Sequence, residues 1–459
     1  MNVPRLLLAG ASSGAGKTTC TVAIARALRA RGLRVALFKC GPDYLDPTYH
    51  ARAIAGPSHT LDGWMMGKDA VLSTFARATH GEGGAVDLAL IEGVMGLFDG
   101  ASPTSDEGSS AEIAKWLGAP VVTVIDAGGM ARTVAAVAHG LATFDPEVRV
   151  GGVIANRVGS RGHLDLLKKA LREPPLFGGF PRDAAPAFPE RHLGLRTASE
   201  DAVPEALFDR WGALAEEWLG LDALLALARS APPLEAPVTP VRAAKSRPCR
   251  IGVAWDAAFH FYYEENLRLL ESLGATLVRF SPVNDRALPD VSGLYLGGGY
   301  PEVHAAQLAD NGAMREAIVA FAERGAPIYA ECGGLMYLTR AIRTIDGASH
   351  PMVGLFEGEA VVHDRLQALG YVEVETQERS LLGEPGLRFR GHQFRYSELV
   401  APGDAPRAYS IRRRRGGETE REGFARGNVL ASYVHAHWAS NPRAAEGFVA
   451  ACADFGAPR

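Results

Sequence analysis

Short apolar runs alternate with helical patterns along most of the chain. Helical patterns such as Thr19–Arg31 and Ala111–Leu117 lie between several of these runs. The runs are continuous rather than alternating, which is typical of strands buried on both faces of a parallel sheet. In the first half we expect five such strands: Leu6–Leu8, Val35–Phe38, Leu88–Ile91, Val121–Ile125 and Gly152–Ala155.

The alternation stops once, in a proline-rich stretch. Residues 231–248 hold five prolines, several charges and little periodicity, which predicts a linker. The α/β pattern then resumes with the runs Ile251–Trp255, Thr276–Phe280, Gly293–Leu296 and Pro327–Ala330, and with a helix near Glu264–Leu273. We therefore predict an α/β protein of two doubly wound domains, residues 1–230 and 249–459, joined by the linker 231–248.

Composition narrows the class of protein. The 459 residues are 47% hydrophobic, so two or three domains with sizeable cores can form. The 48 Lys and Arg against 52 Asp and Glu give a formal net charge of -4, which lacks the positive excess typical of nucleic-acid-binding proteins. No apolar run approaches the ~18 residues of a membrane span. The five cysteines are scattered, odd in number and without metal-ligand spacing, so we expect a reducing, cytoplasmic setting.

A glycine-rich loop follows the first apolar run and predicts a phosphate site. Such loops need glycines whose backbone N–H groups wrap the phosphate, a lysine that reaches the outer phosphates, and a hydroxyl for Mg²⁺. The helix that begins near Thr18 adds the positive end of its dipole. Five residues separate Gly10 from Gly16, where the usual motif has four; the alternative is a glycine-rich turn with a chance lysine. We expect these loop residues to bind ATP: Ser13, Gly14, Ala15, Gly16, Lys17, Thr18 and Thr19.

Two acidic residues follow apolar runs near this loop. Asp43 and Glu92 lie at predicted strand ends, where doubly wound sheets bind their ligands. Together with Thr18 they are candidate Mg²⁺ ligands, and the alternative is that they form turns or cap helices. Asn156, after a later run, is placed to meet the nucleotide base; a plain loop is the alternative.

A cysteine lies at a second glycine-rich corner. Cys332 follows the run Pro327–Ala330, and the next two glycines permit a tight strand-to-helix turn that would expose a nucleophile. We expect N–H groups of Gly298, Gly299 and Gly333 to receive an oxyanion. The late run Val429–His437 places His435 and His437 on the same side of one strand, so either histidine can serve as the base. The alternative for Cys332 is a buried apolar cysteine.

These motifs resemble the cobyrinic acid a,c-diamide synthase family. The resemblance covers nearly the whole chain, and the segment Gly-Pro-Asp-Tyr-Leu-Asp-Pro at residues 41–47 is its most specific part. It implies a dethiobiotin-synthetase-like P-loop NTPase domain followed by a class I, flavodoxin-like glutamine amidotransferase domain. The segments that carry it are the phosphate loop, Lys39–Asp46, Glu92–Gly100, Tyr295–Glu302, Ala330–Leu335, Gly391–Ser397 and Ser432–Trp438.

The resemblance also implies a reaction. Such enzymes use glutamine and ATP to amidate the a and c acetates of a corrinoid polycarboxylate, hydrogenobyrinate or cobyrinate, in cobalamin biosynthesis. Cys332 would form a thioester with glutamine and release ammonia, and Mg-ATP would convert the acetate to an acyl phosphate. The class usually has a Glu two residues after the histidine base, but this chain has His437 there, so the third member of the triad stays open. The residues implied for the corrinoid side are Asp43, Tyr44, Leu45, Asp99, His392 and Arg395.

The motifs are also compatible with other functions. Within the same chemistry, a cobyric acid synthase or a nickel-sirohydrochlorin a,c-diamide synthase would share motifs. A different class is a P-loop switch ATPase with an inactive amidotransferase-like domain, which would not need Cys332 and His435 together. The metal content of the ring, the order of amidation and a homodimeric state are open.

Overall fold

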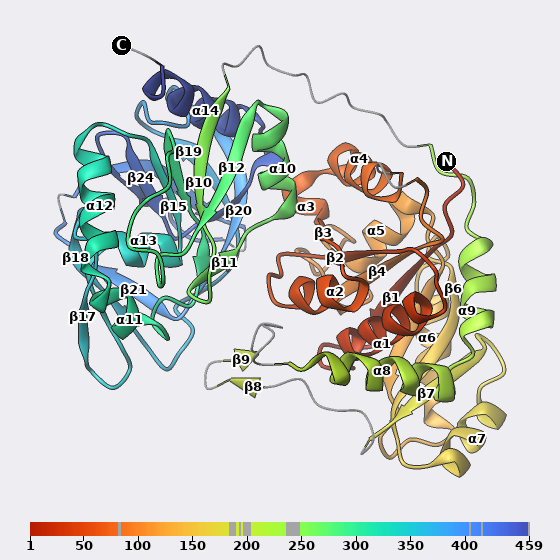
Figure 1. The fold of residues 1–459 in the computed structure, drawn as a ribbon. Coiled ribbons are helices and arrows are strands. Elements are labelled where there is room, and N and C mark those ends of the chain that lie inside the picture. Colours follow the sequence, from red (N-terminus) through yellow and green to blue (C-terminus); the bar gives the residue numbers. More distant parts are fainter. Residues whose placement is uncertain are drawn as a thin grey trace. The chain divides into compact units, whose positions relative to one another are not determined.

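The computed structural model describes residues 1–80, 84–182, 190–191, 194–195, 203–235, 248–403, 405–414 and 416–457 (Figure 1). The chain divides into two compact units, residues 1–239 and 240–459. Most of the predicted linker, residues 236–247, lies outside the described residues.

The first unit is built on a seven-stranded sheet in the order β3-β2-β4-β1-β5-β6-β7, in which all neighbouring strands are parallel. The prediction of a parallel sheet is thereby confirmed. Its strands are β1 (Arg5–Gly10), β2 (Val35–Cys40), β3 (Ser58–Leu61), β4 (Leu88–Gly96), β5 (Val121–Asp126), β6 (Val150–Val158) and β7 (Leu176–Pro181). A separate two-stranded sheet joins β8 (Glu190–Arg191) and β9 (Gly194–Leu195).

Helices cover both faces of this sheet. One core cluster packs strand residues such as Leu8 against Ala23 of α1 and Trp211 of α8. A second cluster joins Val153 of β6 to residues of α6 and α7 on the other side. The helices are α1 (Lys17–Ala30), α2 (Asp46–Ile54), α3 (Gly63–Met66), α4 (Lys68–Thr79), α5 (Ser110–Leu117), α6 (Thr133–Thr143), α7 (Arg161–Ala170), α8 (Glu205–Trp218) and α9 (Leu221–Arg229).

The second unit has a ten-stranded mixed sheet in the order β12-β10-β13-β15-β24-β23-β22-β19-β20-β25. From β12 to β24 the neighbours are parallel, as the apolar runs predict, and from β24 to β25 they are antiparallel. The strands are β10 (Cys249–Ala254), β12 (Ala275–Phe280), β13 (Gly293–Leu296), β15 (Ile328–Glu331), β19 (Ala368–Thr376), β20 (Arg388–Arg395), β22 (Arg407–Arg413), β23 (Glu420–Arg426), β24 (Val429–Ser432) and β25 (His435–His437).

Smaller elements complete the second unit. A two-stranded sheet joins β11 (Phe259–Phe261) and β14 (Gly298–Gly299). A four-stranded sheet contains β16 (Thr339–Arg343), β17 (Ser349–Pro351), β18 (Phe356–Val362) and β21 (Ser397–Val400). The helices are α10 (Glu264–Ser272), α11 (Ala305–Asp310), α12 (Gly312–Glu323), α13 (Gly333–Leu338) and α14 (Arg443–Phe455), and one 3₁₀ turn spans Trp438–Ser440.

The antiparallel half of the second sheet is the part that the apolar runs do not predict. In β19, Val372 and Val374 are buried, whereas Glu373 lies on the other face and pairs with Arg412 of β22. Such alternation is typical of a sheet with one solvated face. In this half, β20 pairs with β25, and the N–H of Ala436 in β25 donates to Glu331, the last residue of β15.

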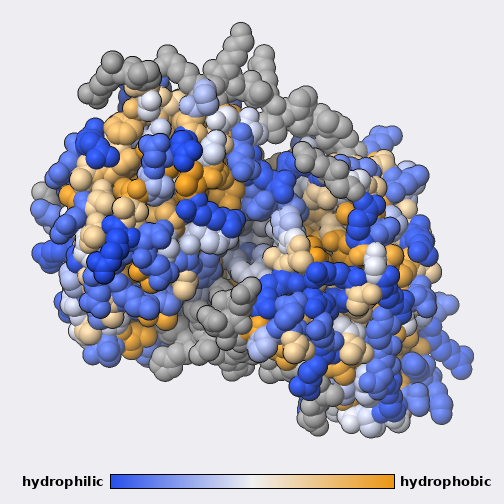
Figure 2. Space-filling model, viewed as in Figure 1, coloured by the Kyte–Doolittle hydropathy of each residue, from blue (hydrophilic) through white to orange (hydrophobic). Residues whose placement is uncertain are grey.

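Among the described residues no helix is long and apolar enough to cross a membrane. On the face drawn in Figure 2, hydrophilic side chains are interleaved with hydrophobic ones over both units.

Candidate active sites

The glycine-rich loop connects β1 to α1 at the carboxyl edge of the first sheet. Gly14 and Gly16 have φ angles of 74° and 95°, which favour glycine. A Cβ on Gly16 would lie 2.0 Å from Nδ2 of Asn156, so the loop also needs glycine there for space. Lys17 Nζ donates to the carbonyl oxygen of Met95 at 2.6 Å. The loop is therefore preformed around the start of α1, the geometry that a phosphate site requires.

The remaining predicted ATP residues surround this turn. Ser13 is exposed, whereas Thr18 and Thr19 are half-buried in the first turn of α1. Asn156 is 7% exposed, and its Nδ2 donates to the carbonyl oxygen of buried Ala15 at 2.9 Å. This hydrogen bond connects the loop to β6 and stabilises it. Binding of the nucleotide base by Asn156 stays a prediction.

Glu92, at 0% exposure, is the centre of a charged cluster beside the loop. Thr18 Oγ1 donates to Glu92 Oε1 at 2.7 Å, and Lys39 Nζ donates to the same oxygen at 2.9 Å. His50 Nε2 lies 2.6 Å from Glu92 Oε2, and Lys39 also pairs with Asp46. Burial opposes ionisation, but Lys39 and His50 outweigh it and hold the pKa of Glu92 well below its usual range. Glu92 is therefore a carboxylate at neutral pH.

Sequence reasoning did not identify Lys39 and His50 as site residues. Lys39 lies in β2 directly opposite Glu92 of β4 in the parallel register. The available signal was a lysine inside an otherwise apolar strand, since a buried lysine is rare unless it is paired. His50 carried no such signal, because it lies in a helix whose packing depends on the tertiary fold.

The acidic residues of the two adjoining loops have structural contacts. Asp43 Oδ1 accepts from the backbone N–H groups of Leu45 and Asp46, at 2.8 and 3.0 Å, while its Oδ2 lies 3.8 Å from Lys39 Nζ. Asp99 is exposed, and its Oδ2 accepts from the N–H of Gly96 at 3.0 Å. Asp43 thus forms a turn and also faces the cluster, whereas Asp99 shapes its own loop. Tyr44 and Leu45 are half-buried beside Asp43.

In the second unit, Cys332 lies at the corner between β15 and α13. Its φ of 46° and ψ of -98° are unusual for a residue with a side chain, as expected of a strained nucleophile elbow. Its N–H donates to Ser432 O at 2.7 Å. A Cβ on Gly334 would lie 2.2 Å from Leu296 O, so the corner packs directly on β13. The side chain is 8% exposed.

The predicted oxyanion glycines lie close to this elbow. A Cβ on Gly333 would lie 3.1 Å from the backbone nitrogen of Gly299. A Cβ on Gly298 would lie 2.4 Å from Cε1 of His435. The structure thus brings Gly298, Gly299, Gly333 and His435 together beside Cys332.

Three histidines lie side by side near the elbow. His392 of β20 is directly opposite His435 of β25, and their rings stack with centroids 5.0 Å apart. The hydroxyl of Tyr263 is 3.0 Å from Nδ1 of His392, and the Tyr263 ring packs on His437 at 4.6 Å. Nε2 of His437 is 4.0 Å from Oε2 of Glu265.

His392 and Arg395 were expected on the corrinoid side. The structure places His392 against His435, and Arg395 lies over the ring of Tyr433 at 4.5 Å, where its charge opposes the rise that burial causes in the pKa of Cys332. His392 therefore lies against the candidate base and Arg395 acts on the thiol, and corrinoid binding by either residue stays a prediction.

Burial controls ionisation in this cluster. Burial raises the pKa of Cys332 to about 12, an effect that Glu302 strengthens and Arg395 weakens. Burial lowers the pKa of His435 to about 3 and that of His437 to about 4. Burial therefore favours the neutral forms of Cys332, His435 and His437.

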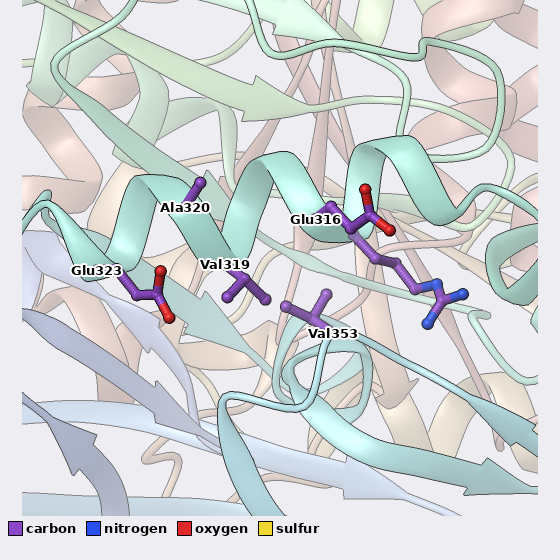
Figure 3. Close-up of a pocket in the computed structure, with 6 residues that line it drawn as sticks. Glu316, Val319, Ala320, Glu323 and Val353 are labelled. Carbon is purple, nitrogen blue, oxygen red and sulfur yellow. The ribbon is translucent and has the colours of Figure 1, made fainter.

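A pocket of about 330 Å³ lies elsewhere on the second unit, beside α12 (Figure 3). No predicted site residue lines it. The lining residues are Arg315, Glu316, Val319, Ala320, Glu323 and Val353.

Two family models match the chain, one within each of its two units. A CobQ/CobB/MinD/ParA nucleotide binding domain matches residues 6–195, and a CobB/CobQ-like glutamine amidotransferase domain matches residues 250–443.

Several proteins named cobyrinate a,c-diamide synthase are similar over nearly the whole chain. The one from Leptospira interrogans is 51% identical over 454 residues, which cover 98% of this chain and 99% of that protein. The one from Syntrophotalea carbinolica is 47% identical over 459 residues, covering 98% and 99%. The one from Dehalococcoides mccartyi is 42% identical over 463 residues, covering 98% of each.

Proposed function

The chain belongs to the cobyrinate a,c-diamide synthase family, and on this basis we propose that it amidates the a and c acetates of a corrinoid with glutamine and ATP. The observation that carries the proposal is the coexistence of a preformed phosphate loop and a strained cysteine elbow, whose neighbouring turn at Gly298 and Gly299 contacts His435. We assign ATP and the corrinoid to residues 1–230, and glutamine to residues 249–459.

The thiol site would release ammonia from glutamine. Sγ of Cys332 bonds to the side-chain amide carbon, the thiol proton passes to His435, and the N–H groups of Gly298, Gly299 and Gly333 receive the oxyanion. His435 then protonates the leaving nitrogen as the C–N bond breaks. Water, activated by the same imidazole, hydrolyses the thioester to glutamate and restores the thiol. The neutral forms that burial favours suit this sequence, because the proton would move from Cys332 to His435 only when glutamine is attacked.

The phosphate site would activate the acceptor. A corrinoid acetate oxygen attacks the γ-phosphorus of ATP, ADP leaves, and ammonia displaces phosphate from the acyl phosphate to give the amide. Lys17 and the loop N–H groups hold the phosphates. Asp43, Tyr44, Leu45 and Asp99 are proposed to shape the acceptor side.

We propose that Thr18, Asp43 and Glu92 would hold Mg²⁺ at this edge of the sheet, where the Glu92 oxygens now contact Thr18, Lys39 and His50. Although no cluster of three metal-binding side chains is found among the described residues, the Thr18 hydroxyl and the ionised Glu92 carboxylate lie 2.7 Å apart, and Asp43 faces the same cluster. These are the hard oxygen donors that Mg²⁺ takes in one or two copies beside substrate phosphates. When bound, the ion neutralises charge on the phosphates.

The test is mass spectrometry of the ring after turnover. Cobyrinic acid, hydrogenobyrinic acid and sirohydrochlorin are each incubated with the protein, Mg-ATP and amide-¹⁵N-glutamine. We expect two labelled amides on cobyrinic or hydrogenobyrinic acid, formed only with both ATP and glutamine. Cys332→Ala should abolish labelling from glutamine but keep amidation from added ammonia. Intact glutaminase activity with no amidated ring would refute the proposed acceptor.

Two further expectations belong to this proposal. The cytoplasm is the proposed location, which the five scattered cysteines support. A homodimer is proposed as the assembly, and sedimentation velocity of the full chain would test it.

A further inference from the structure

The residue two positions after the histidine base is not an acid in this chain. His437 occupies that place at 0% exposure, and within the described residues neither of its ring nitrogens has a hydrogen-bond partner. The acid nearest to it, Glu265, is 4.0 Å from Nε2 of His437. The orientation of His435 must therefore be maintained in another way.

Glu331, the residue before the nucleophile, is a fully buried carboxylate with three donors. Its Oε1 accepts from the Tyr329 hydroxyl and from the backbone N–H of Ala436, both at 3.0 Å. Its Oε2 accepts from the Tyr295 hydroxyl, also at 3.0 Å. Burial raises the pKa of Glu331 to about 7, although the three hydrogen bonds to its two oxygens oppose this rise.

The hydrogen bond from Ala436 to Glu331 connects the segment that carries the nucleophile to the segment that carries the base. Ala436 lies between His435 and His437 on β25, and Glu331 is bonded covalently to Cys332. One side-chain hydrogen bond therefore joins the backbone next to the nucleophile to the backbone next to the base, although 105 residues separate them in sequence.

The two tyrosines make this connection rigid. Tyr295 and Tyr329 are partners in the parallel register of β13 and β15, and their ring centroids are 5.5 Å apart. Trp438, which follows His437, packs on both rings at 5.4 Å. The carboxylate is thus held by side chains that are themselves fixed by packing.

We propose that Glu331 is a positioning residue of the thiol site: its carboxylate, held by Tyr295 and Tyr329, anchors Ala436 and so keeps His435 in reach of Cys332. The inference rests on the proposed glutaminase step, and it assigns to Glu331 the structural part of the role that a triad carboxylate has elsewhere. Glu331 touches neither the substrate nor the reacting sulfur in this role.

The experiment compares Glu331→Gln with Glu331→Leu in the full chain. The glutamine variant keeps an acceptor for Ala436, so its glutaminase kcat should stay within about tenfold of the wild type. The leucine variant loses the anchor, and a misplacement near 1 Å should lower kcat about 100-fold while KM changes by less than about threefold. Tyr329→Phe should fall between them. Tyr337→Phe is the matched control, because the buried Tyr337 hydroxyl has no partner among the described residues.

Amidation driven by added ammonia distinguishes a damaged thiol site from loss of the whole fold. If the leucine variant keeps ammonia-driven amidation but loses glutaminase, the positioning role is supported. If it is folded by near-ultraviolet circular dichroism and its glutaminase kcat stays within about threefold of the wild type, the proposal is wrong, since loss of a 1 Å constraint must cost more. If Glu331→Gln is folded and as inactive as Glu331→Leu, the negative charge and not the anchor is what matters, which also overturns it. A wild-type chain without any glutaminase activity would instead refute the proposed function.

Discussion

Replacing Gly298 by alanine should disable the thiol site without disturbing the phosphate site. The added Cβ would lie 2.4 Å from Cε1 of His435 and 3.2 Å from its Nδ1. Carbon atoms in contact are ordinarily about 3.5–4.0 Å apart, so the ring must retreat by about 1 Å. The ring also stacks on His392 at 5.0 Å, which limits how it can yield. A shift of this size near a reacting centre lowers kcat about 100-fold.

The assay is glutamine hydrolysis at saturating glutamine, followed by amidation with added ammonia. We expect Gly298→Ala to lose about 99% of its glutaminase kcat and to keep ammonia-driven amidation within about twofold. Gly312→Ala is the control, because the nearest atom to its new Cβ is 3.8 Å away at the start of α12. If Gly298→Ala hydrolyses glutamine at a rate close to that of the control, His435 does not act from the position that the structure gives it.

Three other predictions concern ionisation and the phosphate loop. Burial raises the pKa of Cys332 to about 12, so the rate of its alkylation by iodoacetamide should still rise about tenfold per pH unit above pH ~9. The alkylation rate of an ordinary thiol no longer rises there, and a plateau near pH ~8.5 for Cys332 would contradict the prediction. The pKa of His437 is lowered from 6.5 to about 4, so the unfolded chain binds this proton at a higher pH than the folded chain does. The folded state is therefore fully stable above pH 6.5 and loses stability as the pH falls from 6.5 through 4. Over this pH range the free energy of unfolding in urea should fall by about 3 kcal/mol less for His437→Leu than for the wild type. An equal pH dependence of the two unfolding free energies would refute this. Gly16→Ala, with φ at 95° and a Cβ 2.0 Å from Asn156 Nδ2, should abolish ATP-dependent amidation while glutaminase activity persists; normal amidation would exclude the loop as the ATP site.

Much of the framework could be predicted from local sequence. The apolar runs identified β1, β2, β4, β5 and β6, since continuous hydrophobicity is typical of strands covered on both faces. The two glycine-rich corners identified the loop before α1 and the elbow before α13, because glycine spacing reports backbone geometry directly. His435 and His437 were predicted at the end of a single strand over Val429–His437, but the structure divides this run into β24 and β25, which pair with different neighbours.

The partners of these residues could not be predicted in this way. His392 meets His435 only because the antiparallel half of the second sheet sets β20 beside β25 in one register. Lys39 and His50 meet Glu92 because β2 lies beside β4 and α2 packs over that edge. A shift of one residue in either pairing would turn these side chains to the opposite face.

By itself the sequence determined what each segment can be: which strands are buried, where the chain must turn through glycine, and which residues carry a phosphate cradle and a thiol. Tertiary structure alone decided which groups act together, such as Glu331 with Ala436 and Thr18 with Glu92. The reason is physical. Periodicity and turn preference depend on near neighbours in the chain, whereas burial, pKa and hydrogen-bond partnership depend on strand order and register between segments that are 74 and 105 residues apart.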